Sequence, residues 1–137
     1  MGRHTVTEST TCPQCHADAK LVHVATTGER LRLSSTLECT DESHRYVADY
    51  AELTDDARAA FYRVEGRWAL TVRDLGPNRI SALRILRSRL GATPEAIGRQ
   101  IRESEPICSG TLAEVEQLAD HLEPVGVEVN VQRSAER

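Results

Sequence analysis

Three cysteines constrain the N-terminal half of this chain more than any other feature. Cys12 and Cys15 form a C-x2-C motif, and Cys39 follows after twenty-three intervening residues. The segment before Tyr46 has few large apolar side chains, and aromatic residues make up only 4% of the whole sequence. A segment of this kind buries too little apolar surface to offset the conformational entropy lost on folding. We therefore expect a metal ion to hold it together.

A tetrahedral Zn2+ site needs one more ligand besides these three thiolates. His44 follows Cys39 after four residues, and Glu42 stands where a second C-x2-C motif would place its cysteine. Neutral imidazole is a common zinc ligand, whereas a carboxylate is unusual in a structural site. The predicted ligands are Cys12, Cys15, Cys39 and His44, with Glu42 as the alternative. The pattern resembles a zinc ribbon with structural Zn2+; a redox-active C-x2-C usually precedes a helix, and no helical pattern follows here.

Short runs of alternating and β-branched side chains predict strands at residues 20–25, 31–33, 36–39 and 46–49. This interpretation leaves His4 in a frayed N-terminus. Thr54 is placed to cap a helix over residues 54–63, with Asp55 and Asp56 at the positive end of its dipole. We expect a zinc-ribbon-like β domain at residues 1–50 and a linker helix at residues 51–66.

The second half shows a regular succession of strand, turn and cap signals. The predicted strands are residues 68–72 and 127–131, and the predicted helices are residues 79–90, 93–104 and 111–123. Asn78 and Thr93 are placed to cap the first two helices, and Thr111 forms a capping box with Glu114. If residues 106–109 form a short edge strand, the order is β-α-α-β-α-β. The whole chain then has an α+β fold.

The charge distribution places a basic segment within an acidic chain. The formal net charge is −4, yet residues 76–104 contain six arginines and two glutamates, a balance of +4. These arginines are Arg79, Arg84, Arg87, Arg89, Arg99 and Arg102. A basic patch on an acidic protein favours one selective anionic partner surface. A solvated face with no partner is the alternative.

One side of the helix over residues 79–90 differs from its core stripe. At 100° per residue, the core stripe consists of Ala82, Ile85, Leu86 and Leu90. Ile80 lies far from that stripe, between Arg84 and Arg87, and Leu83 lies at the margin. An exposed aliphatic side chain ringed by arginines is typical of a protein-binding hot spot. The competing interpretation is that Ile80 packs beneath the turn at residues 76–78.

Residues 67–133 resemble the C-terminal domain of bacterial ribosomal protein L7/L12, a fold shared with the Clp protease adaptor ClpS. The resemblance lies in the Gly-x-Asn-Arg-Ile turn at residues 76–80, the Glu-Ser-x-Pro segment at 103–106 and the Gly-Val-Glu-Val ending at 126–129. It implies binding of translational GTPases through the first long helix and the start of the second. The corresponding residues here are Arg79, Ile80, Leu83, Arg84, Arg87 and Arg99. The dimerisation helices and hinge of L7/L12 are missing, so we do not expect the stalk protein itself.

These features favour a non-enzymatic protein–protein binding module that docks on an acidic or helical surface, with residues 134–137 as a disordered tail. The sequence has no phosphate loop, nucleophile elbow or H-E-x-x-H motif. It also lacks an apolar run of about 20 residues and a signal peptide, so we expect a cytoplasmic location without membrane partners. Nucleic-acid binding by the zinc-ribbon-like half, in a regulator of transcription or translation, is the alternative, although that half is not basic. A further alternative is the capture of peptide N-termini, as by ClpS.

Overall fold

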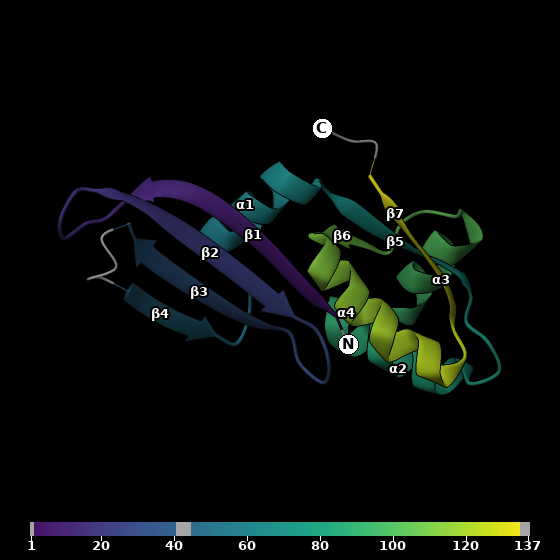
Figure 1. Cartoon of the computed structure of the whole chain (residues 1–137). Helices are drawn as coiled ribbons and strands as arrows, with labels where there is room; N and C mark the ends of the chain where they lie inside the picture. Colours follow the sequence, from purple (N-terminus) through teal and green to yellow (C-terminus); the bar gives the residue numbers. More distant parts are fainter. Residues whose placement is uncertain (1, 41–44, 135–137) are drawn as a thin grey trace. The chain divides into compact units, whose positions relative to one another are not determined.

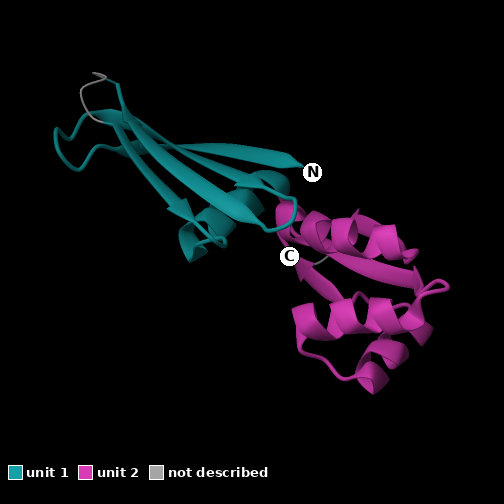
Figure 2. Cartoon of the chain, turned by 90° about the horizontal axis from the view of Figure 1, so that it is seen from below, with its two compact units in different colours: residues 1–65 teal, residues 66–137 magenta. Residues whose placement is uncertain are grey.

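A computed structural model describes residues 2–40 and 45–134 of the chain, in two compact units, residues 1–65 and 66–137 (Figure 2). The described residues form two antiparallel sheets and four α-helices, which confirms the predicted α+β class. The unit boundary follows Glu65. Each unit is described below by itself.

Unit 1 is a four-stranded antiparallel sheet in the order β1-β2-β3-β4 (Figure 1). Its elements are β1 (Arg3–Thr11), β2 (Asp18–Thr26), β3 (Arg32–Cys39), β4 (Arg45–Tyr50) and α1 (Asp55–Glu65). Helix α1 packs against β1 and buries Ala57, Ala60 and Phe61. Val6 and Leu33 from the sheet are also buried. The core of this unit therefore contains few large side chains, as the sequence indicated.

Strand β1 corrects the expectation of a frayed N-terminus. It pairs with β2 without interruption from Arg3, opposite Thr26, to Thr11, opposite Asp18, so His4 lies within a strand. Threonines at alternate positions of β1 suit the exposed face of a strand, and Val6 supplies the buried side. The predicted strands at 31–33 and 36–39 are likewise one continuous strand, β3, because the serines between them pair with β2 and with β4.

Helix α1 is part of the packing of unit 1, whereas the sequence pattern indicated a linker. Thr54 Oγ1 accepts a hydrogen bond from the backbone N–H of Ala57 at 3.2 Å, as predicted for its cap. Near the other end of the helix, Arg63 forms an ion pair with Glu8 of β1. The helix is held because its small and aromatic side chains bury one face against the sheet, and an amphipathic face stabilises a helix this short.

Unit 2 has a three-stranded antiparallel sheet in the order β6-β5-β7. Its elements are β5 (Trp68–Asp74), α2 (Arg79–Leu90), α3 (Pro94–Arg102), β6 (Cys108–Gly110), α4 (Leu112–Leu122), a 3-10 turn (Glu123–Val125) and β7 (Glu128–Arg133). The succession β-α-α-β-α-β is the one predicted. Its core joins Leu70 and Val72 of β5 to Leu86, Ile97 and Leu122 of the three helices. Residues 135–137 of the expected tail lie outside the described residues, and Ser134 N–H donates to Arg67 O at 2.9 Å.

The helix caps of unit 2 agree with the sequence at two positions and differ at a third. Thr93 Oγ1 accepts from Ala96 N–H at 3.2 Å, and Thr111 with Glu114 forms a complete capping box. Asn78 occupies the N-cap position of α2 but makes no capping bond there. Its Nδ2 donates instead to Val125 O at 3.4 Å. This hydrogen bond of Asn78 thus connects the start of α2 to the segment before β7.

Gly76 makes the closest backbone approach in this region. It has φ of +76°, and an added Cβ would lie 2.1 Å from the carbonyl oxygen of Gly126. No side chain fits there, since the obstructing atom belongs to the backbone. The turn at residues 76–78 and the segment at residue 126, which the sequence motifs singled out separately, are therefore neighbours in space.

Gly76→Ala is expected to destabilise unit 2 by about 2 kcal/mol or more, because it adds a backbone clash to an unfavourable positive φ. Gly91→Ala is a matched control: Gly91 has φ of +68°, but nothing lies within 4 Å of an added Cβ. It should cost only ~1 kcal/mol. Urea unfolding of the full chain followed by the fluorescence of Trp68, the single tryptophan, measures both. Equal costs would contradict the close approach.

Candidate functional site

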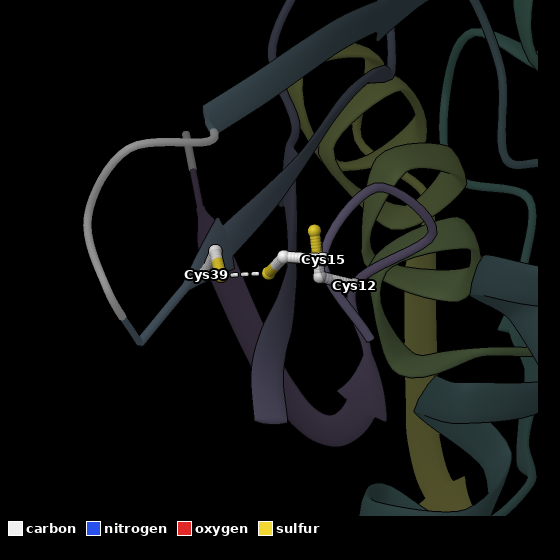
Figure 3. A group of neighbouring side chains, drawn as sticks. All are labelled: Cys12, Cys15 and Cys39. Atoms are coloured by element: carbon white, nitrogen blue, oxygen red, sulfur yellow. Dashed lines mark hydrogen bonds between the residues drawn. The ribbon is translucent and has the colours of Figure 1, made fainter. Parts of the chain in front are cut away.

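The three N-terminal cysteines meet at one end of the unit 1 sheet (Figure 3). Cys12 follows β1, Cys15 lies in the turn between β1 and β2, and Cys39 is the last residue of β3. The turn is tight: Cys12 N–H donates to Ala17 O at 2.8 Å, and His16 N–H donates to Cys12 O at 2.9 Å. Pairing of Ala19 with Cys39 brings the end of β3 beside this turn.

The geometry of this three-cysteine cluster fits a thiophilic metal ion. The three Sγ atoms lie within 4.8 Å of one another, and Cys15 and Cys39 are 3.1 Å apart. Thiolates on a tetrahedral Zn2+ lie about 3.8 Å apart, so small side-chain adjustments would accommodate the ion. Cys12 and Cys39 are buried and Cys15 is partly exposed. The predicted grouping of these three residues is thus seen in the structure.

The surroundings of Cys12 favour its thiolate form. Its pKa is lowered to about 7, chiefly because the backbone N–H of Cys15 hydrogen-bonds to its sulfur; burial opposes this effect. The N–H of Gln14 and the two neighbouring thiols also lower the pKa. Hydrogen bonds to the charged form stabilise it, and the thiolate is the species that binds metals. The turn therefore places Cys12 beside the other two cysteines and also favours the thiolate form that can bind a metal.

The predicted fourth ligand, His44, and its alternative, Glu42, lie outside the described residues. Within the described ranges, the group able to hold a metal consists of the three cysteines alone. His16 adjoins Cys15 but does not join them. Cys108 belongs to unit 2, and burial raises the pKa of its thiol to about 11, so it remains protonated and unreactive at neutral pH.

The proposed partner-binding residues of α2 divide by exposure. Ile80 is 75% exposed, which contradicts the interpretation that it packs beneath the preceding turn. Arg84 and Arg87 follow it at helical spacings of four and seven, and Arg79 flanks it; all three arginines are exposed. We call Arg79, Ile80, Arg84 and Arg87 the α2 face. Ile80 also lines a shallow hollow of about 380 Å³ together with residues 77–79 and 81.

Two other arginines of residues 76–104, Arg89 and Arg99, already have partners within unit 2. Arg99 of α3 lies 3.8 Å from Glu103, and the Arg89 guanidinium lies 2.5 Å from Nδ1 of His121. His121 thus has a partner that the sequence did not reveal. Leu83 is partly buried and packs against the core. Among residues 2–40 and 45–134, no acidic side chain forms an ion pair with an arginine of the α2 face.

Comparisons of the chain with protein-family models, curated proteins and solved structures find no match. The resemblance of residues 67–133 to the L7/L12 domain therefore remains an expectation from the sequence motifs alone. None of the described helices has the length and apolar character needed to cross a bilayer.

A buried histidine in unit 1 was not expected from the sequence. His23 is 3% exposed, its Nδ1 lies 2.7 Å from Ser35 Oγ, and its Nε2 lies 4.0 Å from a carboxylate oxygen of Glu8. Burial lowers its pKa, the carboxylates of Glu8 and Asp56 partly oppose the shift, and Arg63 adds to it. The register of β1, β2 and β3 brings Glu8, His23 and Ser35 together, and helix α1 supplies Asp56 and Arg63. The alternation of inward and outward side chains along the strands would have indicated that His23 is buried near Glu8 only if β1 had been predicted as a strand.

The stability of unit 1 is expected to fall as the pH drops below about 6.5. The pKa of His23 is lower in the folded chain than in the unfolded chain, so the unfolded chain binds the proton more tightly. Stability is therefore present above the ordinary pKa of histidine and is lost as the pH falls toward the lowered value. Hydrogen exchange of β2 in the full chain, corrected for intrinsic rates, measures this. When the pH is lowered, the metal-loaded His23→Gln variant should lose less protection from exchange than the metal-loaded wild type. Equal losses in the two proteins would show that a group other than His23 causes the pH dependence.

Proposed function

We propose that this protein is a non-enzymatic binding module whose second unit docks on an acidic or helical surface of another protein through the α2 face. The observation that carries the proposal is the exposed Ile80 beside Arg79, Arg84 and Arg87, which have no acidic partner in the described chain. Removing a branched aliphatic side chain from water stabilises a complex by about 1.5–3 kcal/mol. The guanidinium groups add directional bonds to carboxylates.

The position of these charges on α2 also favours an external anionic partner. Arg79 is the first residue of the helix, and the first turn contains no acidic residue. A cation at the positive end of a helix dipole is unfavourable by about 0.3–1 kcal/mol. An acidic partner would remove that penalty, so the arrangement contributes more to binding than to the stability of the helix.

The resemblance to the L7/L12 domain identifies the partner class that we propose, a translational GTPase or a ribosome-associated factor. In this proposal Leu83 and Arg99 contribute at the margin, because Leu83 is partly buried and Arg99 pairs with Glu103. The α2 face itself supplies the centre of the contact. Its small area fits a transient rather than an obligate complex.

We further propose that the three-cysteine cluster binds a structural Zn2+, with His44 as fourth ligand or Glu42 in its place. The ion would connect the β1–β2 turn to the end of β3 through Cys12, Cys15 and Cys39. Support comes from the sulfur geometry and from the hydrogen bonds that favour the Cys12 thiolate. Four protein ligands leave no open position for a substrate, so the site would stabilise unit 1 without catalysis.

Docking is tested by capture from a lysate of the source cell with the full chain, followed by direct titration of each captured translational GTPase. Arg84→Glu/Arg87→Glu should weaken binding at least about tenfold. Arg30→Glu/Arg32→Glu is the matched control, since both residues are exposed and the charge change is equal. Ile80→Ala separates the apolar contribution. Capture of no GTPase, or equal binding by the α2 variant, would contradict the proposed docking.

Zinc binding is tested by elemental analysis of the purified full chain, which should contain about one Zn2+ per molecule. Cys39→Ser should lose the metal, because removal of a thiolate breaks the ligand set, and Cys108→Ser should retain it. Comparison of His44→Ala with Glu42→Ala identifies the fourth ligand. A zinc-free protein that takes up neither Zn2+ nor Co2+ with its thiols reduced would exclude the site.

A further inference from the structure

Strand β4 forms an open edge of the unit 1 sheet. It pairs with β3 on one side, from Leu33 opposite Tyr50 to Glu38 opposite Arg45, and is the last strand of the order β1-β2-β3-β4 (Figure 1). In an antiparallel edge strand, about half of the backbone N–H and C=O groups point away from the sheet. These groups can pair with another strand.

The exposed apolar side chains of the chain concentrate on this strand. Every residue of β4 is exposed, with exposed fractions of 43% for Tyr46, 55% for Val47 and 41% for Tyr50. These are three of the five large apolar side chains exposed in the described residues, the others being Val64 and Ile80. Strand β1, at the opposite edge, exposes no such side chain and packs against α1.

Strand β4 lacks most of the features that protect open edges from pairing, and its two charged side chains, Arg45 and Asp49, are opposite in sign. Its six residues include no proline, no lysine and no inward-pointing charge, and its pairing with β3 is regular. The pairing of β5 with β7, in contrast, contains an irregularity between Val72 and Asp74. An unprotected apolar edge is a pairing site or an aggregation hazard.

We propose that β4 pairs antiparallel with β4 of a second copy of this chain, about a twofold axis at Val47. This register sets Val47 against its own counterpart and Arg45 against Asp49 of the second copy. On the opposite face Tyr46 lies against Ala48. Because side chains alternate across a strand, both charge pairs lie on one face and the tyrosines on the other.

The sequence of β4 is self-complementary in this register alone. On one face it places a cation, an apolar residue and an anion symmetrically about Val47, namely Arg45, Val47 and Asp49. A parallel in-register pair would oppose like charges, and a shift by two residues would set Val47 against Asp49. Glu38 of β3 lies 4.0 Å from Arg45, so the pairing would extend this row of alternating charges across the dimer.

Sedimentation equilibrium of the full chain over a roughly hundredfold range of concentration tests the dimer. Val47→Lys should raise its dissociation constant by about tenfold or more, because two lysines would meet at the axis. Val64→Lys is the matched control: Val64, on α1, is 58% exposed and outside β4. Circular dichroism verifies that each variant is folded. A monomeric wild type, or a Val47→Lys variant that dimerises as well as the wild type, would overturn the proposal.

Changing the charges tests whether the side chains of residues 45 and 49 meet across the dimer. Arg45→Asp alone opposes two aspartates, and Asp49→Arg alone opposes two arginines, so each variant should be mostly monomeric. A mixture of the two restores both opposite-charge pairs and should form a heterodimer with an affinity within about tenfold of the wild type. Failure of the mixture to associate, while the wild type dimerises, would overturn this pairing.

Discussion

The contact between the β1–β2 turn and the end of β3, made by three cysteines, closes the end of the unit 1 sheet. Cys12, Ala19 and Cys39 form a buried cluster of their own, to which Leu37 adds a partly buried side chain and α1 adds none. Small side chains bury little apolar area, and their packing contributes correspondingly little stability. The strand ends are therefore held mainly by backbone hydrogen bonds, such as those from Cys12 N–H to Ala17 O and from Thr40 N–H to Asp18 O, and a metal on the three cysteines would add to them.

In unit 2 the corresponding constraint is the close approach of the turn at residues 76–78 to residue 126. It fixes where β5 ends and where α2 begins, with Asn78 bonded to Val125 O. Burial of Ala82 and Leu86 then determines the rotation of the helix. Because the first residue of α2 and the rotation of the helix about its axis are both fixed, the Ile80 side chain cannot reach the core and projects into solvent. The α2 face is thus a consequence of backbone packing at its own N-terminus.

The sequence predicted what is decided locally. The N-caps of α3 and α4 and the glycine that ends α2 are short-range signals, and the spacing of Cys12, Cys15 and Cys39 anticipated their cluster. Strand β1 was missed because its hydroxyl-rich alternation is weak until β2 supplies the pairing. Asn78 and His121 have their partners in distant segments, which no local pattern shows. The exposure of Ile80 likewise depended on tertiary packing, and the sequence could only leave two interpretations open.

The four helices of the described chain differ in the charge of their first turns. Helix α1 begins with two aspartates, and α3 and α4 each carry a glutamate in the first turn, as the helix dipole favours. Helix α2 has no acid there and begins with Arg79. It also lacks a side-chain cap and exposes Ile80. Departures from local rules of this kind are common where a protein builds a site, and they are the reason why our docking proposal is centred on the start of α2.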